Sequence, residues 1–214
     1  MDRSRQAVKD TYDRIAAHFS KTREYAWPEV ESFLDSQPAA RTALDVGCGN
    51  GRHTELLARK ADRAVGLDAS TGLLSEARQR ATAREFEAAF VAGDAASLPF
   101  TADSIDLAVY VATLHHLPER ELRRASLDEL ARVLTPGSRA LVSAWSTAHD
   151  SFDHEGDEGF DTMVDWTLPG GETVPRFYHI YAPAEFEADL AASRLRVVKN
   201  EISSGNCYAV VTPE

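Results

Sequence analysis

The sequence predicts an α/β fold built on a doubly wound, mostly parallel sheet of seven strands that ends in a C-terminal antiparallel hairpin. Short apolar runs alternate with helical stretches over most of the chain, which is typical of consecutive strand–helix–strand units. Near the end, two apolar runs are joined by Ser204-Gly205-Asn206, a turn that favours a hairpin. The 214 residues are enough for one domain with a large core.

The individual elements follow from this alternation. Parallel strands are expected at residues 42–47, 63–68, 87–92, 105–111 and 139–145, and the hairpin strands at 197–203 and 207–212. Helices are expected at residues 2–19, 28–34, 52–60, 70–85, 119–134 and 183–192. Residues 1–214 should therefore form a single domain, in which residues 1–36 are an N-terminal helical cap.

The segment 146–176 departs from this rhythm, because it is polar and contains glycines. It carries eight acids, which are Asp150, Asp153, Glu155, Asp157, Glu158, Asp161, Asp165 and Glu172. Connections this long are usually either functional or disordered. Because the segment follows the fifth strand, we expect an acidic insert near the active site, at the carboxyl ends of the strands, with at least its middle mobile. The alternative is a disordered surface loop.

A glycine-rich turn follows the first strand and suggests a ligand site. Gly47, Cys48 and Gly49 lie between an apolar run and a helical pattern, so a ligand could rest on bare backbone at a helix N-terminus. Arg52 occupies the third position of the dinucleotide fingerprint, where Gly or Ala is needed. Asp45 would repel a pyrophosphate but suits an ammonium group. The alternative is a turn whose glycines only ease helix packing.

Two further acids end the next two strands. Asp68, followed by Ala69, lies about 20 residues beyond the turn, where a ribose-binding carboxylate is expected. Asp94, followed by Ala95, could accept a hydrogen bond from the exocyclic amine of adenine. A ligand with a ribose, an adenine, an amino-acid head and no phosphate is S-adenosylmethionine (SAM), which becomes S-adenosylhomocysteine once its methyl group is transferred. Val111, at the end of the fourth strand, completes this set of cofactor-binding candidates.

These motifs, over residues 41–145, resemble the class I SAM-dependent methyltransferases, which have a Rossmann-like fold. Motifs at both ends extend the resemblance over nearly the whole chain, to the wobble-uridine tRNA carboxymethyl methyltransferases. They are residues 12–23, 27–28, 114–117, 176–181 and 205–208. The resemblance implies methyl esterification of 5-carboxymethyluridine in tRNA. The acidic segment and acidic surface depart from the eukaryotic members, and an archaeal, salt-adapted relative would explain both.

The resemblance also implies a set of catalytic residues. A substrate carboxylate is already ionised at pH 7, so no general base is required. Arg176 would grip one carboxylate oxygen, Tyr178, His179 and His116 would orient it, and Trp145 would stack on the uracil. Arg23 could serve the substrate or the cofactor, and the cofactor set further includes Tyr12 and His18. Each residue also has a structural alternative: Arg176 could be a surface charge, and Tyr12 and Phe19 have the spacing of helix core positions.

The charge balance bears on partners. The formal net charge is −11, which suits either a high-salt cytoplasm or an ordinary acidic enzyme. A tRNA partner needs local basic groups, and candidates are the arginines and lysines of residues 2–24 and a second group, Arg120, Arg123, Arg124, Arg132 and Arg139. The resemblance implies a small zinc-binding activator protein that adds a strand at the third strand, from Phe86 to Val91.

Other features bound the function. Cys48 and Cys207 give no metal-ligand spacing, and neither a transmembrane stretch nor a signal-peptide pattern is present, so we expect a cytoplasmic protein without a metal site or a membrane partner. Two other functions remain open. One is methyl transfer to a small molecule, such as a quinone precursor or a carboxylic acid. The other is a non-catalytic SAM-binding scaffold.

Overall fold

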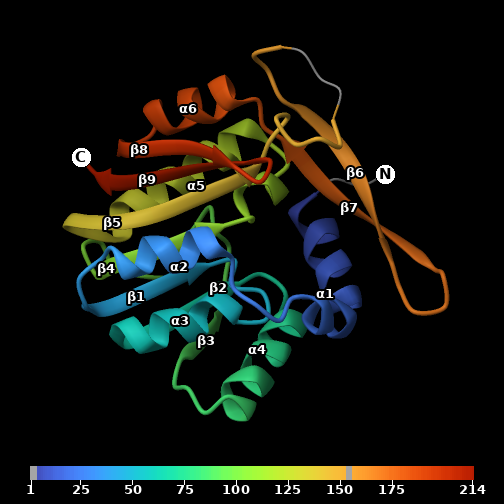
Figure 1. Ribbon diagram of the computed structural model, residues 1–214, viewed down its shortest axis with the longest axis horizontal. Coiled ribbons are helices and arrows are strands. Elements are labelled where there is room, and N and C mark those ends of the chain that lie inside the picture. Colours follow the sequence, from blue (N-terminus) through green and yellow to red (C-terminus); the bar gives the residue numbers. More distant parts are fainter. Residues whose placement is uncertain (1–3, 153–155) are drawn as a thin grey trace.

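The computed structural model describes residues 4–152 and 156–214, and it confirms the predicted α/β architecture (Figure 1). A seven-stranded sheet has the order β3-β2-β1-β4-β5-β9-β8. Its strands are β1 (Ala40–Val46), β2 (Ala61–Asp68), β3 (Ala89–Ala92), β4 (Ile105–Val111), β5 (Leu134–Trp145), β8 (Leu195–Ser203) and β9 (Asn206–Pro213). The first five are parallel, and β9 runs antiparallel to β5 and β8. The closing pair is therefore the predicted hairpin.

Helices cover both faces of this sheet. They are α1 (Arg5–Thr22), α2 (Pro28–Asp35), α3 (Arg52–Lys60), α4 (Thr71–Ala83), α5 (Arg120–Val133) and α6 (Pro183–Ala191), with a short 3-10 turn at Leu114–His116. Alternate residues of a strand face opposite sides. In β4, Leu107 and Val109 pack with α2 and α3, whereas Ala108 and Tyr110 pack with α5 and α6. This two-sided burial explains the continuous apolar runs of the central strands.

Helix α1 lies across the carboxyl ends of the strands and is fixed to α4. Asp13 Oδ1 accepts hydrogen bonds from Ser70 Oγ at 2.7 Å and from Gly72 N at 2.8 Å. Ser70 is also the N-cap of α4, since its hydroxyl accepts from Leu73 N. One aspartate of α1 thus binds the first turn of α4, and this contact places the N-terminal helix above the ligand end of the sheet.

Residues 146–176 contain regular structure that the sequence did not predict. Strands β6 (Phe160–Thr167) and β7 (Thr173–Ile180) form a separate antiparallel pair beside α1 (Figure 1). Trp166 and Val174 are buried against α1, whereas Asp161 and Asp165 are exposed. The acids therefore mark the outer face of an amphipathic hairpin, and packing on α1 stabilises it. Asp153 and Glu155 lie outside the described residues.

Smaller differences concern the ends of the strands. β3 begins at Ala89 rather than 87, and Phe86 N instead donates to Ala81 O at the end of α4. β5 begins at Leu134 rather than 139, and its register against β4 shifts between Ile105 and Leu107. Among the described residues, no helix has the length and apolarity needed to span a bilayer.

Candidate active site

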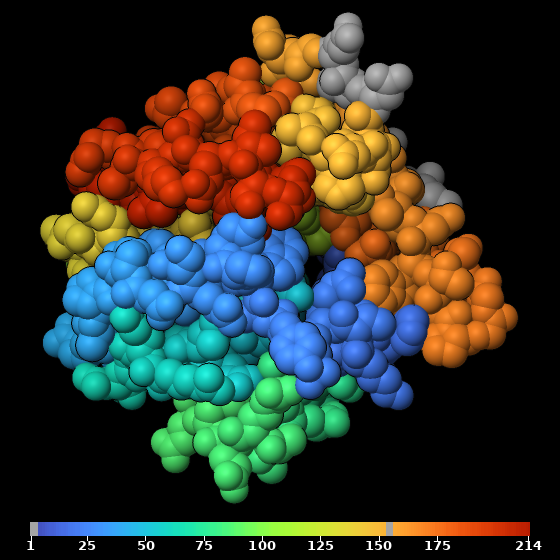
Figure 2. Space-filling model, in the orientation of Figure 1, coloured from blue at the N-terminus to red at the C-terminus, as the bar shows by residue number. Residues whose placement is uncertain are grey.

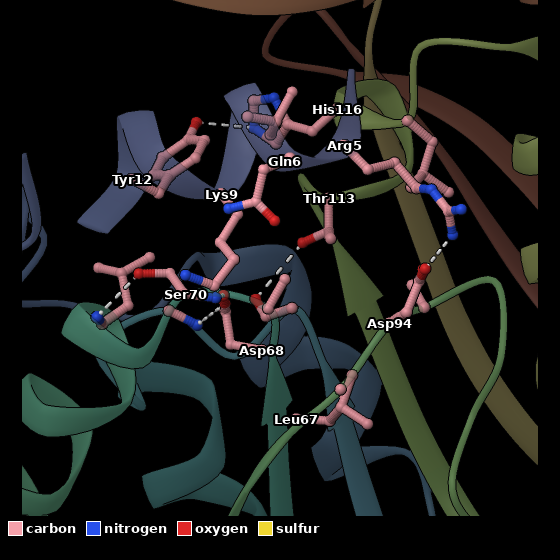
Figure 3. Close-up of a pocket in the computed structure, with 18 of the residues that line it drawn as sticks. Arg5, Gln6, Lys9, Tyr12, Leu67, Asp68, Ser70, Asp94, Thr113 and His116 are labelled. Atoms are coloured by element: carbon pink, nitrogen blue, oxygen red, sulfur yellow. Dashed lines mark hydrogen bonds and ion pairs between the residues drawn. The ribbon is translucent and has the colours of Figure 1, made fainter. Parts of the chain in front are cut away.

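A cavity of about 660 Å³ lies at the carboxyl ends of β1 to β4, beneath α1 (Figure 3). The predicted residues Gly47, Gly49, Asp68, Ala69, Asp94, Ala95, Tyr12 and His116 all line it. Its position between β1 and β4, where the strand order reverses, is the usual ligand site of an open α/β sheet. Its size is that of a small-molecule site.

The glycine turn leaves backbone exposed to this cavity. Gly47 has φ +72°, and a Cβ there would lie 2.1 Å from Thr113 Oγ1, so no side chain fits. At Gly49, also left-handed with φ +54°, a Cβ would meet only Phe19, at 3.8 Å. Cys48 is buried on the other side, and its Sγ would be 2.9 Å from a Cβ at Gly66. Cys48 therefore fills a small packing space and does not line the cavity.

Asp68 is held as an acceptor at the cavity wall. Its Oδ2 accepts from Gly49 N and its Oδ1 from Ser70 N, both at 2.8 Å. Burial raises the pKa of Asp68 to about 6, although these backbone hydrogen bonds oppose the shift. The group is consequently still ionised at pH 7, and a carboxylate of this kind can bind a vicinal diol.

Helix α1 brings to the cavity two basic residues that the sequence analysis considered only as candidates for tRNA contact. Arg5 and Lys9 line the cavity together with Tyr12, and Arg5 Nη1 forms an ion pair with Asp94 Oδ2 (Figure 3). Lys9 in turn binds Asp13 at 2.6 Å. Their spacing of i, i+4 and i+7 was the available signal, because it puts all three on one helix face.

Besides Cys48, four predicted cofactor residues lie outside the cavity. Asp45 is 1% exposed, accepts from Thr54 Oγ1 at 2.6 Å, and has a pKa raised to about 7 by burial. Val111 points into the core, and the next two residues line the cavity in its place. His18 Nδ1 accepts from Trp166 Nε1 at 3.0 Å. Arg23 lies over the rings of Phe19 and Trp166 and does not line the cavity.

A second group of side chains begins at the cavity wall with Tyr12 and His116. Tyr12 Oη lies 2.8 Å from His116 Nε2, and His116 Nδ1 lies 2.9 Å from Phe177 O. A carbonyl only accepts, so Nδ1 carries the hydrogen and Nε2 accepts from the tyrosine. Burial lowers the pKa of His116 to about 3. The imidazole is therefore neutral and fixes the Tyr12 hydroxyl (Figure 3).

Arg176, from β7, is a buried cation behind this pair. It is 7% exposed, and its Nη1 donates to Tyr178 Oη at 2.6 Å. Its guanidinium carbon lies 4.8 Å from the centroid of the Trp166 ring and 5.1 Å from that of Tyr178. Its Nε has no hydrogen-bond partner, and within the described ranges no carboxylate lies within 4.0 Å of it. A buried charge without a counter-ion is costly, so this place suits an anionic ligand.

Of the other predicted catalytic residues, Trp145 lies in the group around Arg176 and Tyr178, whereas His179 lies elsewhere. Trp145 belongs to this group, since its ring centroid is 5.3 Å from that of Tyr178. His179 does not, because alternation along β7 turns it away from Tyr178. Its ring nitrogens meet Asp161 Oδ1 at 2.8 Å and Glu185 at 3.1 Å. His179 therefore ties the hairpin to α6 instead of facing the Arg176 cation.

The second basic group suggested for tRNA contact is largely neutralised internally. Arg120 and Arg124 both bind Asp189 Oδ1, at 2.7 and 2.8 Å. Arg123 lies 3.4 Å from Glu185, and Arg132 binds Glu129 at 2.6 Å. These four arginines join α5 to α6 or pair within α5, which leaves little uncompensated positive charge on this helix for a tRNA contact. The acids on α6 that neutralise three of them are far away in the sequence.

Comparison with known proteins identifies the family. A family described as "Methyltransferase domain" matches residues 43–137. A protein of Encephalitozoon cuniculi named as a methyltransferase is 34% identical over 205 residues, which is 94% of this chain and 92% of that protein. The chain belongs to the SAM-dependent methyltransferases. Its cofactor is accordingly SAM, as predicted from the glycine turn and its acids.

Other relatives are named for a tRNA reaction. The tRNA (carboxymethyluridine(34)-5-O)-methyltransferase of Schizosaccharomyces pombe is 30% identical over 75% of this chain and 68% of that protein. The Xenopus tropicalis protein of that name is 42% identical over 66% of this chain, but only 21% of its own length is covered. This methyltransferase thus spans about a fifth of the relatives from Xenopus tropicalis, Macaca fascicularis and Mus musculus, and 61% of the relative from Saccharomyces cerevisiae.

Solved structures confirm the fold. A complex titled DhpI-SAH superposes with a TM-score of 0.74 at 22% identity, covering 97% of this chain and 96% of that one. A chain from the complex between the Haloferax volcanii Trm112 methyltransferase activator and a methyltransferase gives 0.70 at 18% identity, covering 96% and 97%. At these identities the likeness concerns the fold alone.

Proposed function

We propose that this methyltransferase esterifies the carboxylate of a 5-carboxymethyluridine-type nucleotide at the wobble position of a tRNA, in the cytoplasm. The observation that carries the proposal is Arg176, a buried guanidinium without an acidic partner in the described part of the chain. The names of the relatives from fission yeast and Xenopus support the choice of substrate.

The proposed chemistry needs positioning more than acid–base catalysis. SAM supplies a methyl group on a positively charged sulfur, and the reaction leaves S-adenosylhomocysteine and a neutral ester. The substrate carboxylate enters already ionised, so no residue has to remove a proton. Arg176 brings it in with an unpaired N–H, while the Tyr178 hydroxyl and the Trp145 ring lie beside it. A dry, fixed arrangement of two opposite charges is what accelerates such a transfer.

The residues around the cavity fit SAM by their chemistry. We assign the ribose hydroxyls to Asp68, the adenine amine to Asp94 with Ala95, and the amino-acid head to the glycine turn, where no side chain covers the backbone of Gly47 and Gly49. Arg5 lies against Asp94 in the part assigned to adenine. Cofactor binding therefore requires the Arg5 side chain, which is 52% exposed, to move toward solvent.

We further propose a small zinc-binding activator as partner, as the sequence resemblance implies. β3 is an edge strand of the sheet, and its four residues are exposed or half-buried. Such an edge presents unpaired backbone groups for strand addition. Phe86 to Ala88, part of the expected docking segment, precede the strand in the isolated chain. The Haloferax volcanii complex with an activator supports a partner of this kind.

The proposed function is tested by product analysis. The chain, with and without an activator, is incubated with labelled SAM and tRNA from a strain lacking the wobble methyl ester, and the nucleosides are identified by mass spectrometry. Arg176→Ala should lower transfer by at least about a hundredfold while SAM affinity stays within about twofold, because Arg176 does not line the cavity assigned to SAM.

Two controls make this result specific. Arg176→Lys keeps the charge but loses the planar fork and should recover only part of the activity. Arg194→Ala removes an exposed arginine whose partner is Asp128 and should leave transfer unchanged. Esterification of free carboxylic acids with none on tRNA would instead establish the small-molecule alternative.

A further inference from the structure

Arg23 and Arg52 lie near each other without an acidic partner. Eleven arginines of the described residues lie within 4.0 Å of a carboxylate oxygen, and neither of these two is among them. The chain has 34 acidic residues against 23 lysines and arginines, so acids are plentiful. What sets Arg23 and Arg52 apart is that each lacks such a partner while the charge of one acts on the other.

Aromatic rings hold both guanidinium groups. The guanidinium carbon of Arg52 lies 5.2 Å from the centroid of the Trp27 ring. That of Arg23 lies 5.4 Å from the Phe19 centroid and 5.3 Å from the Trp166 centroid. Such contacts fix the planar groups but do not cancel their charge. The N–H donors of Arg52 make no protein hydrogen bond within the described ranges.

The electrostatics of Arg52 show that its charge is not compensated. Burial, followed by the charge of Arg23, lowers the pKa of Arg52 to about 10, so the group remains a cation at pH 7. Asp45 acts in the opposite direction, but it is engaged by Thr54, and burial raises its own pKa to about 7. The two guanidinium groups thus form a positive spot in an acidic protein.

One tryptophan ring connects this spot to Arg176. The Trp166 ring lies under both Arg23, at 5.3 Å, and Arg176, at 4.8 Å. On the other side, the Trp27 ring lies 6.4 Å from that of Tyr208, at the start of β9. Figure 2 shows the surface hollowed where α1 (dark blue), the β8–β9 turn (red) and the hairpin (orange) meet. Three cations and two tryptophans therefore follow one another from the buried Arg176 outward.

We propose that Arg23 and Arg52 form a subsite for backbone phosphates of single-stranded RNA next to the nucleotide that Arg176 receives. The assignment of that nucleotide rests on the proposed function. Alternating cations and aromatic faces are what a single strand requires, because phosphates meet the cations while bases stack on the rings. The planar arginine fork matches a phosphate group. The subsite also explains how a protein of net charge −11 binds a polyanion: the contact is local.

The test is the salt dependence of RNA binding by the full chain. The probe is an anticodon stem-loop RNA, and its dissociation constant is measured over a range of KCl without methyl transfer. Arg52→Ala should weaken binding roughly tenfold. It should also reduce the slope of log K against log salt by about 0.7, the value for one lost contact on a single strand. Arg52→Lys should restore most of the slope. Arg63→Ala, exposed near the amino end of β2, should change neither quantity.

A second measurement decides whether Arg52 binds an RNA phosphate or the carboxylate of SAM. SAM affinity and the KM for free 5-carboxymethyluridine, which has no phosphate, should both stay unchanged in Arg52→Ala. Loss of SAM affinity, or a wild-type salt slope, would overturn the subsite. A reduced slope in a chain that makes no wobble ester would support the subsite and refute the proposed function, so the two failures are distinguishable.

Discussion

At the scale of single residues, the glycine turn beside the cavity leaves little room for side chains. Gly47 and Gly49 are both left-handed, but only Gly47 is packed against a neighbour, at Thr113. A side chain at Gly47 must displace β4 at its carboxyl end, whereas one at Gly49 projects toward Phe19 and the cavity. The two glycines therefore have different tasks, one in packing and one in leaving space for a ligand.

This difference gives a prediction. Gly47→Ala should destabilise the fold by about 2–4 kcal/mol, the sum of backbone strain and overpacking. Gly49→Ala should cost only about 1 kcal/mol and still lower SAM affinity. Thermal unfolding and calorimetry on both variants measure this. Equal losses of stability would contradict the assignment of Gly47 to packing.

The raised pKa of Asp68 makes cofactor binding depend on pH. Only the carboxylate accepts two hydroxyl donors, so SAM affinity should fall as pH drops through about 6. The same shift opposes folding: the folded state holds the proton at higher pH than the unfolded chain, so stability declines as pH rises from about 4 to about 6. Asp68→Asn should remove both trends. Asp45→Asn, whose site lies outside the cavity, should keep the dependence of binding near pH 6.

At the scale of elements, the hairpin β6–β7 is held from behind by α6. Glu185 accepts from Gly159 N at 2.7 Å and from His179 at 3.1 Å. Burial alone would raise the pKa of Glu185, but these bonds hold it at about 2. This contribution to stability is present above about pH 4.5 and is lost as pH falls toward 2. Because the hairpin carries Arg176, Glu185 would position the proposed acceptor site without touching it.

We therefore expect Glu185→Gln to destabilise the protein by roughly 1–3 kcal/mol and to lower kcat/KM for tRNA at unchanged SAM affinity. The matched control is Glu187→Gln on the same helix, which loses only a contact to Asn200. Unfolding curves and steady-state kinetics give the two readouts. Wild-type turnover in a destabilised Glu185→Gln variant would show that the contact serves the fold alone.

The same elements show what a sequence can reveal. The parallel strands and their helices were predictable, because apolar periodicity and the acids after β2 and β3 are local signals. The β6–β7 pair was not, since its inward face is recognisable only once α1 packs against it. Likewise, Arg176 was predictable as a residue, but its lack of an acidic partner depends on tertiary structure, as does the diversion of His179 to Glu185.

At the scale of the whole molecule, the net charge of −11 sets folding and substrate binding against each other. Salt screens the repulsion among surface acids, because the Debye length falls from about 10 Å at 0.1 M to about 3 Å at 1 M. The melting temperature should therefore rise with KCl. Salt also weakens every phosphate contact, so RNA affinity should fall over the same range. Methylation of tRNA should then pass through a maximum at intermediate salt.

Methylation of free 5-carboxymethyluridine separates the effect of salt on stability from its effect on phosphate contacts. It has no phosphate, so its methylation should follow stability and keep rising where transfer to tRNA already declines. Replacing Arg52 by alanine should move the tRNA maximum to lower salt, because the variant starts with fewer phosphate contacts to lose. Activity and unfolding measured in parallel from about 0.1 M to about 2 M KCl decide this. Coincident profiles for nucleoside and tRNA would mean that phosphate contacts do not limit binding, and the acidic surface would then bear on stability alone.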